Sequence, residues 1–210
     1  MVGPPGAWRV VAVLGLVALS SVAGGGGTES VLDLTIRDGW QGIGVRGTGA
    51  RLWPGSRLLS AYIAENPACV SGKNVAEIGC GLGLCSLVAA RCGAAQGRVQ
   101  TAVLCFGNEH HHGTFHTVLA SDVVYAAGGR SGGFEALVAC LMSLTDARST
   151  TLVAYTPRYR REKAFWECLR PWFTVQRIAL SPALATQECF GGVMLLRLTR
   201  KSPRVSGAGE

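Results

Sequence analysis

Apolar and polar positions form alternating blocks along the central part of the chain. Short apolar runs predict strands, and longer runs with an apolar residue every three or four positions predict helices. Strands are expected at residues 31–36, 75–78, 99–106, 117–120, 151–155, 173–178 and 192–198, and helices at residues 55–65, 84–92, 134–144 and 162–169. This alternation is typical of an α/β sandwich with a mostly parallel sheet. The closing pair of strands predicts an antiparallel hairpin at one edge.

The first 27 residues have a different pattern. An apolar run from Val10 to Leu19 follows Arg9, and Ser21-Val22-Ala23 places small residues at the spacing that a signal peptidase recognises. The run is shorter than the roughly 20 apolar residues that a membrane span needs. We therefore expect a signal-like or disordered leader at 1–27, an α/β domain at 28–199 and a polar tail at 200–210.

Eight cysteines are spread through the chain, and none forms a CxxC pair. Most lie inside apolar runs, which is typical of buried, reduced thiols and opposes both a disulfide framework and export. We expect a cytoplasmic protein, with a secretory or organellar location as the alternative if residues 1–23 act as a signal. His110-His111-His112 and His116 lie in a glycine-flanked loop without fixed geometry, so no metal site is expected.

Composition and charge narrow the picture only slightly. Hydrophobic residues make up 48% of the chain, which excludes wholesale disorder. The net charge of +7 comes from scattered cations, and the densest group is Arg158, Arg160, Arg161 and Lys163. Such a group either contacts an acidic partner or is simply solvated.

The run Glu77-Ile78-Gly79-Cys80-Gly81-Leu82-Gly83 carries the strongest chemical signal. It joins a predicted strand to a predicted helix, so a ligand can lie against bare backbone beside the free N–H groups of the helix. The acidic residue at the strand end argues against phosphate as the main ligand. It suits hydroxyls or a cationic amino group, such as those of S-adenosylmethionine. The alternative is an ordinary turn that uses glycine for close packing.

A second constellation, Ser121-Asp122-Val123-Val124-Tyr125, follows another buried strand. Ligands in such folds bind beyond the carboxyl ends of the strands, so Asp122 and Tyr125 are expected at the same crevice as the glycine turn. A charged residue at a strand end can also cap the following helix.

Four segments together resemble one family. They are Gly47-Thr48-Gly49-Ala50-Arg51-Leu52-Trp53, the glycine run extended to Leu84, the segment 121–125, and Tyr155-Thr156-Pro157-Arg158. In this order they are similar to the seven-β-strand, S-adenosylmethionine-dependent protein-lysine methyltransferases of the methyltransferase-like 21 type, over residues 31–198. The resemblance implies a Rossmann-like class I methyltransferase three-layer sandwich, a protein substrate with an acceptor lysine, and a monomer.

The resemblance also implies roles for individual residues. The cofactor-binding set would be Trp53, Glu77, Gly79, Cys80, Gly81, Gly83, Phe106 and Ser121. Asp122 and Tyr125 would form the mouth that receives the lysine. A carboxylate can orient an ammonium group, and an aromatic face tolerates its charge.

The segment after Gly93 departs from the family pattern. The family continues there into a second strand that ends in an acidic residue, which binds the ribose hydroxyls. Here no acidic residue occurs until Glu109, and too few residues separate Gly83 from Asp122 for two strand–helix units. Leu104-Cys105-Phe106-Gly107 resembles a degraded form of the family's Leu-Asp-Trp-Gly element. We therefore expect one strand–helix unit to be missing, with weakened cofactor binding.

Two other function classes stay open at this point. One is a catalytically inactive interaction protein that keeps the scaffold, which the missing ribose-binding residue favours. The other is a nucleic-acid methyltransferase, which the positive charge suggests. That class commonly uses a proline-containing element to stack a base, and Asp122-Val123-Val124-Tyr125 has no proline, so a nucleic-acid partner is not expected.

Overall fold

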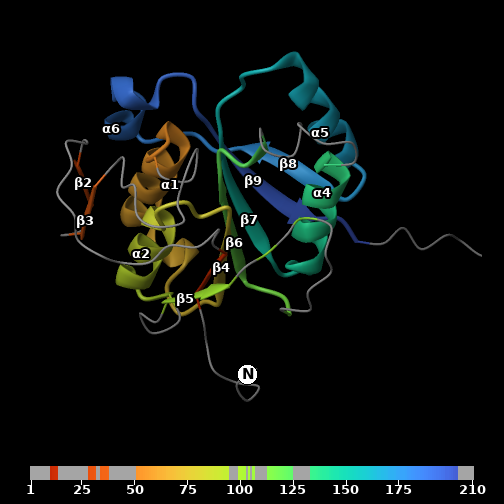
Figure 1. The fold of residues 1–210 in the computed structure, drawn as a ribbon, viewed down its shortest axis with the longest axis horizontal. Coiled ribbons are helices and arrows are strands. Elements are labelled where there is room, and N and C mark those ends of the chain that lie inside the picture. Colours follow the sequence, from red (N-terminus) through yellow and green to blue (C-terminus); the bar gives the residue numbers. More distant parts are fainter. Residues whose placement is uncertain are drawn as a thin grey trace, which may run out of the picture.

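The computed structural model describes residues 10–13, 28–31, 34–37, 51–94, 99–102, 104, 106, 113–124 and 133–202. Their main feature is a seven-stranded sheet with the order β5-β1-β4-β6-β7-β9-β8, covered by helices on both faces (Figure 1). The strands are β1 Val10–Val13, β4 Val75–Ile78, β5 Val99–Ala102, β6 Thr117–Ser121, β7 Thr150–Tyr155, β8 Phe173–Arg177 and β9 Met194–Arg200. The expected Rossmann-like three-layer sandwich is confirmed.

The helices and strands follow the hydrophobic pattern closely. The helices are α1 Pro54–Glu65, α2 Leu84–Arg91, α4 Gly133–Ser143, α5 Lys163–Leu169 and α6 Pro182–Ala185, with short 3₁₀ segments η2 Pro67–Cys69, η4 Arg160–Glu162 and η5 Glu188–Phe190. Strands β1, β4, β5, β6 and β7 run parallel, whereas β9 pairs antiparallel with both β7 and β8. The antiparallel hairpin expected at the C-terminal end is therefore present.

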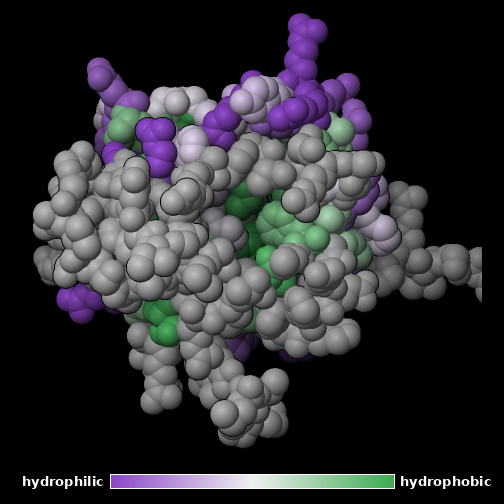
Figure 2. All heavy atoms as spheres, in the orientation of Figure 1, coloured by the Kyte–Doolittle hydropathy of each residue, from purple (hydrophilic) through white to green (hydrophobic). Residues whose placement is uncertain are grey.

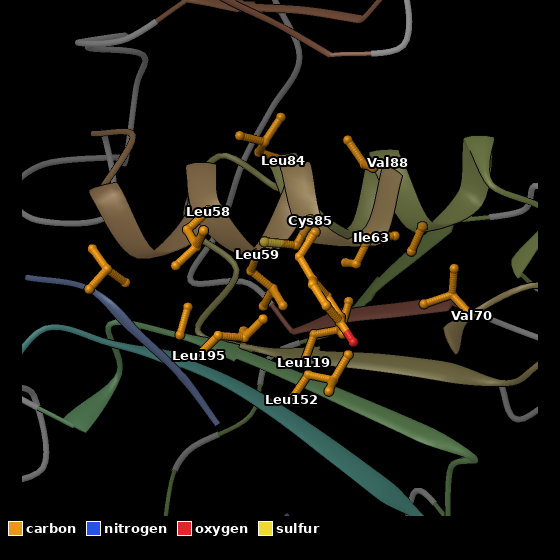
Figure 3. Packing of buried hydrophobic residues seen from close by; sticks show 14 of the residues in the cluster. Leu58, Leu59, Ile63, Val70, Leu84, Cys85, Val88, Leu119, Leu152 and Leu195 are labelled. Carbon is orange, nitrogen blue, oxygen red and sulfur yellow. The ribbon is translucent and has the colours of Figure 1, made fainter. Parts of the chain in front are cut away.

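Two apolar layers hold the helices on the sheet. On one face, α1 and α2 pack over the central strands through a buried cluster that Figure 3 shows from close by. The labelled members are Leu58, Leu59, Ile63, Val70, Leu84, Cys85, Val88, Leu119, Leu152 and Leu195. On the other face, α4 and α5 cover a second cluster, with Phe165 and Phe173 among its fully buried side chains. Because both faces are covered, the central strands are almost entirely buried, and β4 is buried along its whole length.

Strand β1 corrects the expected domain boundary, because it comes from the predicted leader. Val10–Val13 lies between β4 and β5 and pairs in parallel with both, with Val10 opposite Val75 and Val99. A strand that follows α2 directly would be the usual neighbour of β4 in a right-handed crossover. In this sheet β1 takes that neighbouring position and β5 lies one strand further out. Between α2 and β6 the described residues form one strand, β5, and β1 completes the seven-stranded sheet.

The segment expected as one strand at 31–36 is also different. Thr28–Val31 (β2) and Leu34–Arg37 (β3) form a separate antiparallel pair, with Val31 opposite Leu34. Figure 1 shows this pair apart from the main sheet, outside α1 and α2. Alternation of apolar and polar residues predicts an extended backbone and does not show where the chain reverses, so the hairpin was missed.

Two further expectations can be compared with the described residues. No helix among them is long and apolar enough to cross a membrane. The seven cysteines in the described ranges are free thiols; Cys80, Cys85 and Cys140 are buried and Cys189 is exposed. Burial is therefore not uniform among these cysteines.

Candidate active site

The glycine run forms a tight turn between β4 and α2. Gly79, Gly81 and Gly83 have φ values of 63°, 53° and 78°, in the left-handed region that disfavours side chains. A Cβ on Gly79 would lie 2.7 Å from a methyl carbon of Val123, just beyond the end of β6. Gly83 is the N-cap of α2. The turn therefore presents backbone rather than side chains at the carboxyl edge of the sheet.

Glu77 lies beneath this turn and is fully buried. Its Oε2 accepts hydrogen bonds from the backbone N–H of Ser86 at 2.8 Å and from the Ser86 hydroxyl at 2.6 Å. Its Oε1 is buried without a hydrogen-bond partner. One half of this carboxylate thus anchors the first turn of α2, and the other half has no hydrogen-bond partner among the described residues.

Burial also changes the protonation of Glu77. Desolvation raises its pKa from 4.5 to about 7, and the hydrogen bonds from Ser86 oppose this rise only in part. A cationic donor at Oε1 would favour the charged form and lower the pKa again. The site therefore fits a ligand that brings a positive charge.

A thiol and two hydroxyls connect α1, α2 and β6 beside Glu77. The Ser60 hydroxyl donates to Cys85 Sγ at 3.4 Å, and this thiol donates to the Ser56 carbonyl at 3.5 Å. Ser121, half-buried at the end of β6, also hydrogen-bonds Cys85. Burial raises the pKa of Cys85 well above its usual value, so Cys85 is a neutral packing residue.

Asp122 occupies a different environment at the end of the neighbouring strand. It is 3% exposed, and its φ of 51° is the one positive value found for a non-glycine residue in the described ranges. Oδ2 accepts the backbone N–H of Gly55 at 2.8 Å, and Oδ1 accepts Arg158 Nη2 at 3.0 Å and the Thr156 N–H at 3.3 Å. Both oxygens are therefore occupied by groups of the protein itself.

Gly55 is required for this arrangement. A Cβ at position 55 would lie 2.5 Å from Asp122 Oδ2 and 3.3 Å from the Ala154 carbonyl oxygen. The Asp122 carboxylate acts as the N-terminal cap that the side chain of Trp53, the N-cap residue of α1, does not supply. Asp122 thereby joins α1 to the ends of β6 and β7.

Trp53 and Arg158 lie together at the same edge. The Arg158 guanidinium lies 5.1 Å from the centre of the Trp53 ring, and that of Arg51 lies at 5.8 Å. Arg158 is also the ion-pair partner of Asp122 at 3.0 Å. The Asp122 carboxylate holds Arg158 from one side and the aromatic face stabilises its charge from the other.

Glu162 fixes the segment that follows Arg158. Its Oε2 accepts the Tyr155 hydroxyl at 2.7 Å and the Arg158 backbone N–H at 2.9 Å. Glu162 is 2% exposed, and its pKa is lowered, because the hydrogen bonds from Arg158 and Tyr155 outweigh desolvation. Desolvation and the Glu162 carboxylate raise the pKa of Tyr155 to about 12, so Tyr155 remains the donor.

Most of the predicted residues meet at this carboxyl edge. Two differ: Phe106 packs against the apolar cluster on the α4 face, and Tyr125 lies outside the described residues. His110 to His112 also lie outside them, and the described ranges contain no group of three potential metal ligands.

The sequence did not single out four residues that build the site. They are Gly55, Ser86, Arg158 as the partner of Asp122, and Glu162. Arg158 was part of a quoted segment, but the pairing with Asp122 depends on the adjacency of β6 and β7. The other three carry no local signal, because their partners are close only in the folded chain.

The chain is similar to known lysine methyltransferases in sequence. The profile of a lysine methyltransferase family matches residues 92–172. Protein N-lysine methyltransferase METTL21A of Danio rerio is 28% identical over 167 residues, covering 66% of this chain and 73% of that protein. METTL21A of Mus musculus is 26% identical, covering 71% of this chain and 78% of its own length. The chain is thus similar to the METTL21A protein N-lysine methyltransferases over about two thirds of its length.

A third METTL21A relative supports the same relationship, and so does a shorter match. METTL21A of Xenopus tropicalis is 23% identical over 169 residues, which cover 68% of this chain and 75% of that protein. The electron transfer flavoprotein beta subunit lysine methyltransferase of Mus musculus is 43% identical over 44 residues, which cover 21% of this chain and 17% of that protein.

Solved structures agree on the fold. The T. thermophilus 16S rRNA methyltransferase RsmC, in complex with AdoMet and guanosine, aligns with a TM-score of 0.55 at 16% identity, over 83% of this chain and 50% of that one. A TehB-like SAM-dependent methyltransferase from Corynebacterium glutamicum aligns with a TM-score of 0.50 at 16% identity, over 73% of this chain and 90% of that one. At such identities the likeness concerns the fold alone.

Proposed function

We propose that the protein transfers a methyl group from S-adenosylmethionine to the side-chain amine of a lysine in a protein substrate. The METTL21A relatives are protein N-lysine methyltransferases, and the chain has the fold of S-adenosylmethionine-dependent enzymes. The single observation that carries the cofactor assignment is Glu77, buried beneath the glycine turn with Oε1 unpaired. The amino group of a bound amino-acid moiety is the cationic donor that this oxygen lacks.

Each predicted residue then has a physical role. The cofactor would be held against the bare backbone of Gly79, Cys80, Gly81 and Gly83, with Glu77 receiving its ammonium group. Trp53 and Ser121 are proposed to line the remaining sides, and Phe106 to support them from the apolar layer that it packs against. When bound, S-adenosylmethionine would supply a methyl group on a sulfonium sulfur, which a neutral amine would accept by in-line attack with S-adenosylhomocysteine as the leaving group.

The chain's own contribution is alignment of the amine and removal of its proton. We propose that Tyr125 lines the mouth that receives the lysine. Asp122 positions this mouth chiefly by holding Arg158, which in turn lies against Trp53. Both carboxylate oxygens of Asp122 already accept hydrogen bonds, so it positions the mouth more readily than it binds an incoming ammonium directly. This refines the catalytic role expected for Asp122 from the sequence.

We propose that cofactor affinity is lower than in a relative with an acidic residue on the strand beside β4. In this chain that strand is β1, which is followed in the sequence by Leu14-Gly15-Leu16, with no acidic residue before Glu29. A missing charged partner for the ribose hydroxyls costs on the order of 1.5–3 kcal/mol, or roughly one to two decades in affinity.

Calorimetric titration with S-adenosylmethionine tests the cofactor assignment. Because only the charged form of Glu77 pairs with an ammonium group, we expect affinity to be about tenfold weaker near pH 5.5 than near pH 7.2. Glu77→Gln should weaken binding and remove this difference. As a matched control, 5′-methylthioadenosine lacks the amino-acid part and should bind both proteins equally. Equal binding of S-adenosylmethionine to both proteins would contradict the role of Glu77.

Transfer of a labelled methyl group tests the acceptor. The protein is incubated with methyl-tritiated S-adenosylmethionine and a mixture of cellular protein and RNA, and the products are hydrolysed. We expect label in methylated lysine and none in nucleosides. Label in nucleosides would establish the nucleic-acid alternative, and cofactor binding without any transfer would establish the inactive scaffold.

A further inference from the structure

The segment between β7 and α5 forms a basic surface beside the proposed lysine mouth. It begins at Arg158, which pairs with Asp122, and continues through η4 into Lys163. Figure 1 shows this segment rising from the carboxyl end of β7 before it enters α5, and Figure 2 shows hydrophilic side chains standing out from the same edge. A bound substrate that reaches the mouth therefore passes close to it.

The acidic and basic side chains of this segment point in opposite directions. Glu162 points inward, since it is 2% exposed and bonded to Tyr155 and Arg158. Arg160, Arg161 and Lys163 are all exposed. Lys163 meets Glu167 at 3.5 Å, and within the described ranges no carboxylate pairs with Arg160 or Arg161. Within the described part of the chain, the outward side therefore carries two arginines, Arg160 and Arg161, that no carboxylate pairs with.

Tyr159 adds an aromatic surface to the cations. It is 55% exposed, and the Arg161 guanidinium lies 4.8 Å from its ring centre. Stacking reduces the conformational freedom of this arginine before any partner binds, so less entropy is lost when it pairs with a carboxylate. The segment beneath is fixed by the Glu162 hydrogen bonds and by the edge contact of Tyr155 with Trp166, with ring centres 5.1 Å apart.

We propose that Tyr159, Arg160 and Arg161 form a docking surface for an acidic segment of the protein substrate that flanks its acceptor lysine. The proposal rests on the proposed function and adds the substrate class. Charge complementarity selects carboxylates, and arginine binds them in a bidentate manner. A long basic stripe, which nucleic-acid binding through several phosphates requires, is not formed by two stacked or neighbouring arginines.

Fluorescence anisotropy with two synthetic peptides tests this surface. One peptide has a central lysine followed by four glutamates, and the other has four serines in their place. We expect the acidic peptide to bind at least tenfold more tightly at low salt and to lose this advantage as salt is added. Equal binding of the two peptides would overturn the proposal.

Charge reversals locate the effect. Arg161→Glu should weaken binding of the acidic peptide about fivefold to tenfold, and Arg160→Glu somewhat less. Arg148→Glu is the matched control, because it is an exposed reversal just before β7, at the opposite end of the strand, and should change binding less than twofold. Equal losses in Arg161→Glu and Arg148→Glu would overturn the proposal, since only net charge would then matter.

Two further measurements separate this inference from the proposed function. The affinity for S-adenosylmethionine should be unchanged in Arg160→Glu and Arg161→Glu, and so should the melting temperature. Loss of cofactor binding in these variants would show that the segment serves the cofactor rather than a partner. If poly-uridine bound more tightly than the acidic peptide and Arg161→Glu abolished that binding, the surface would be a nucleic-acid surface and the proposal would fail.

Discussion

Glu77 and Asp122 are two buried carboxylates at the ends of neighbouring parallel strands, and they differ in how far the protein satisfies them. Asp122 accepts two backbone N–H groups and an arginine. Glu77 has one satisfied oxygen and one that is buried and unpaired. A carboxylate that already has its cation holds structure together, whereas one that lacks it is suited to receive a charged ligand. The comparison assigns positioning to Asp122 and binding to Glu77.

Removing the carboxylate of Asp122 should have the largest effect on stability. Asp122→Ala leaves Arg158 and the N–H groups of Gly55 and Thr156 without their acceptor, and also places alanine at a φ of 51°. We expect the free energy of unfolding to fall by about 4 kcal/mol in urea titrations. Asp122→Asn keeps an acceptor and tolerates this φ, so its loss should be about half as large. Equal stability of the wild type and Asp122→Ala would contradict the structural role.

Glu77 should show the next largest effect, as a dependence of stability on pH. Its pKa is about 7 in the folded protein and 4.5 without burial, so folding favours the neutral form. The contribution to stability is therefore present below pH 4.5 and is lost as pH rises to about 7. The loss amounts to about 3 kcal/mol for the protein without ligand. Unfolding titrations across this range should show it, and Glu77→Gln should remove it. If the stability of the wild type varied as little with pH as that of Glu77→Gln, the raised pKa of Glu77 would be contradicted.

A smaller effect is expected where α1 meets Asp122. Gly55→Ala would usually stabilise a helix, but here the added Cβ lies 2.5 Å from Asp122 Oδ2. We expect a loss of about 1–2 kcal/mol in the free energy of unfolding. In the Asp122→Ala background the same change should cost much less. A double-mutant cycle measures this coupling, and simple additivity would show that the two residues do not interact.

The aromatic contact of Arg158 should contribute least. Trp53→Leu keeps an apolar side chain but removes the ring 5.1 Å from the guanidinium. We expect a loss of about 0.5–1 kcal/mol in stability, because Arg158 keeps its ion pair with Asp122. If Trp53 also lines the site, the free energy of cofactor binding should fall by more than the free energy of unfolding. Calorimetry measures the two quantities separately. Loss of stability alone would leave Trp53 as a support for Arg158 only.

The sequence predicted the central elements because each carries a local signal. The β4 strand and the glycine turn that follows it agree with the expectation, since apolar runs, glycine and helix periodicity act within a few residues of one another. The partners of Asp122 could not be predicted in the same way. Gly55 and Arg158 reach it only through the packing of α1 and the adjacency of β6 and β7. The role of Phe106 depended on the resemblance alone, and Tyr125 stays a prediction.

Strand β1 also determines the order in which the sheet can be completed during synthesis. Val10–Val13 leaves the ribosome long before either β4 or β5, the two strands that it joins. Until residues 99–102 are available, β1 can pair with β4 but has no partner on its other edge. In that interval β4 can pair with the β1 segment of another copy instead of its own, which is the first step of a domain swap. The strand that completes the sheet within one chain is thus also the element through which two chains can exchange.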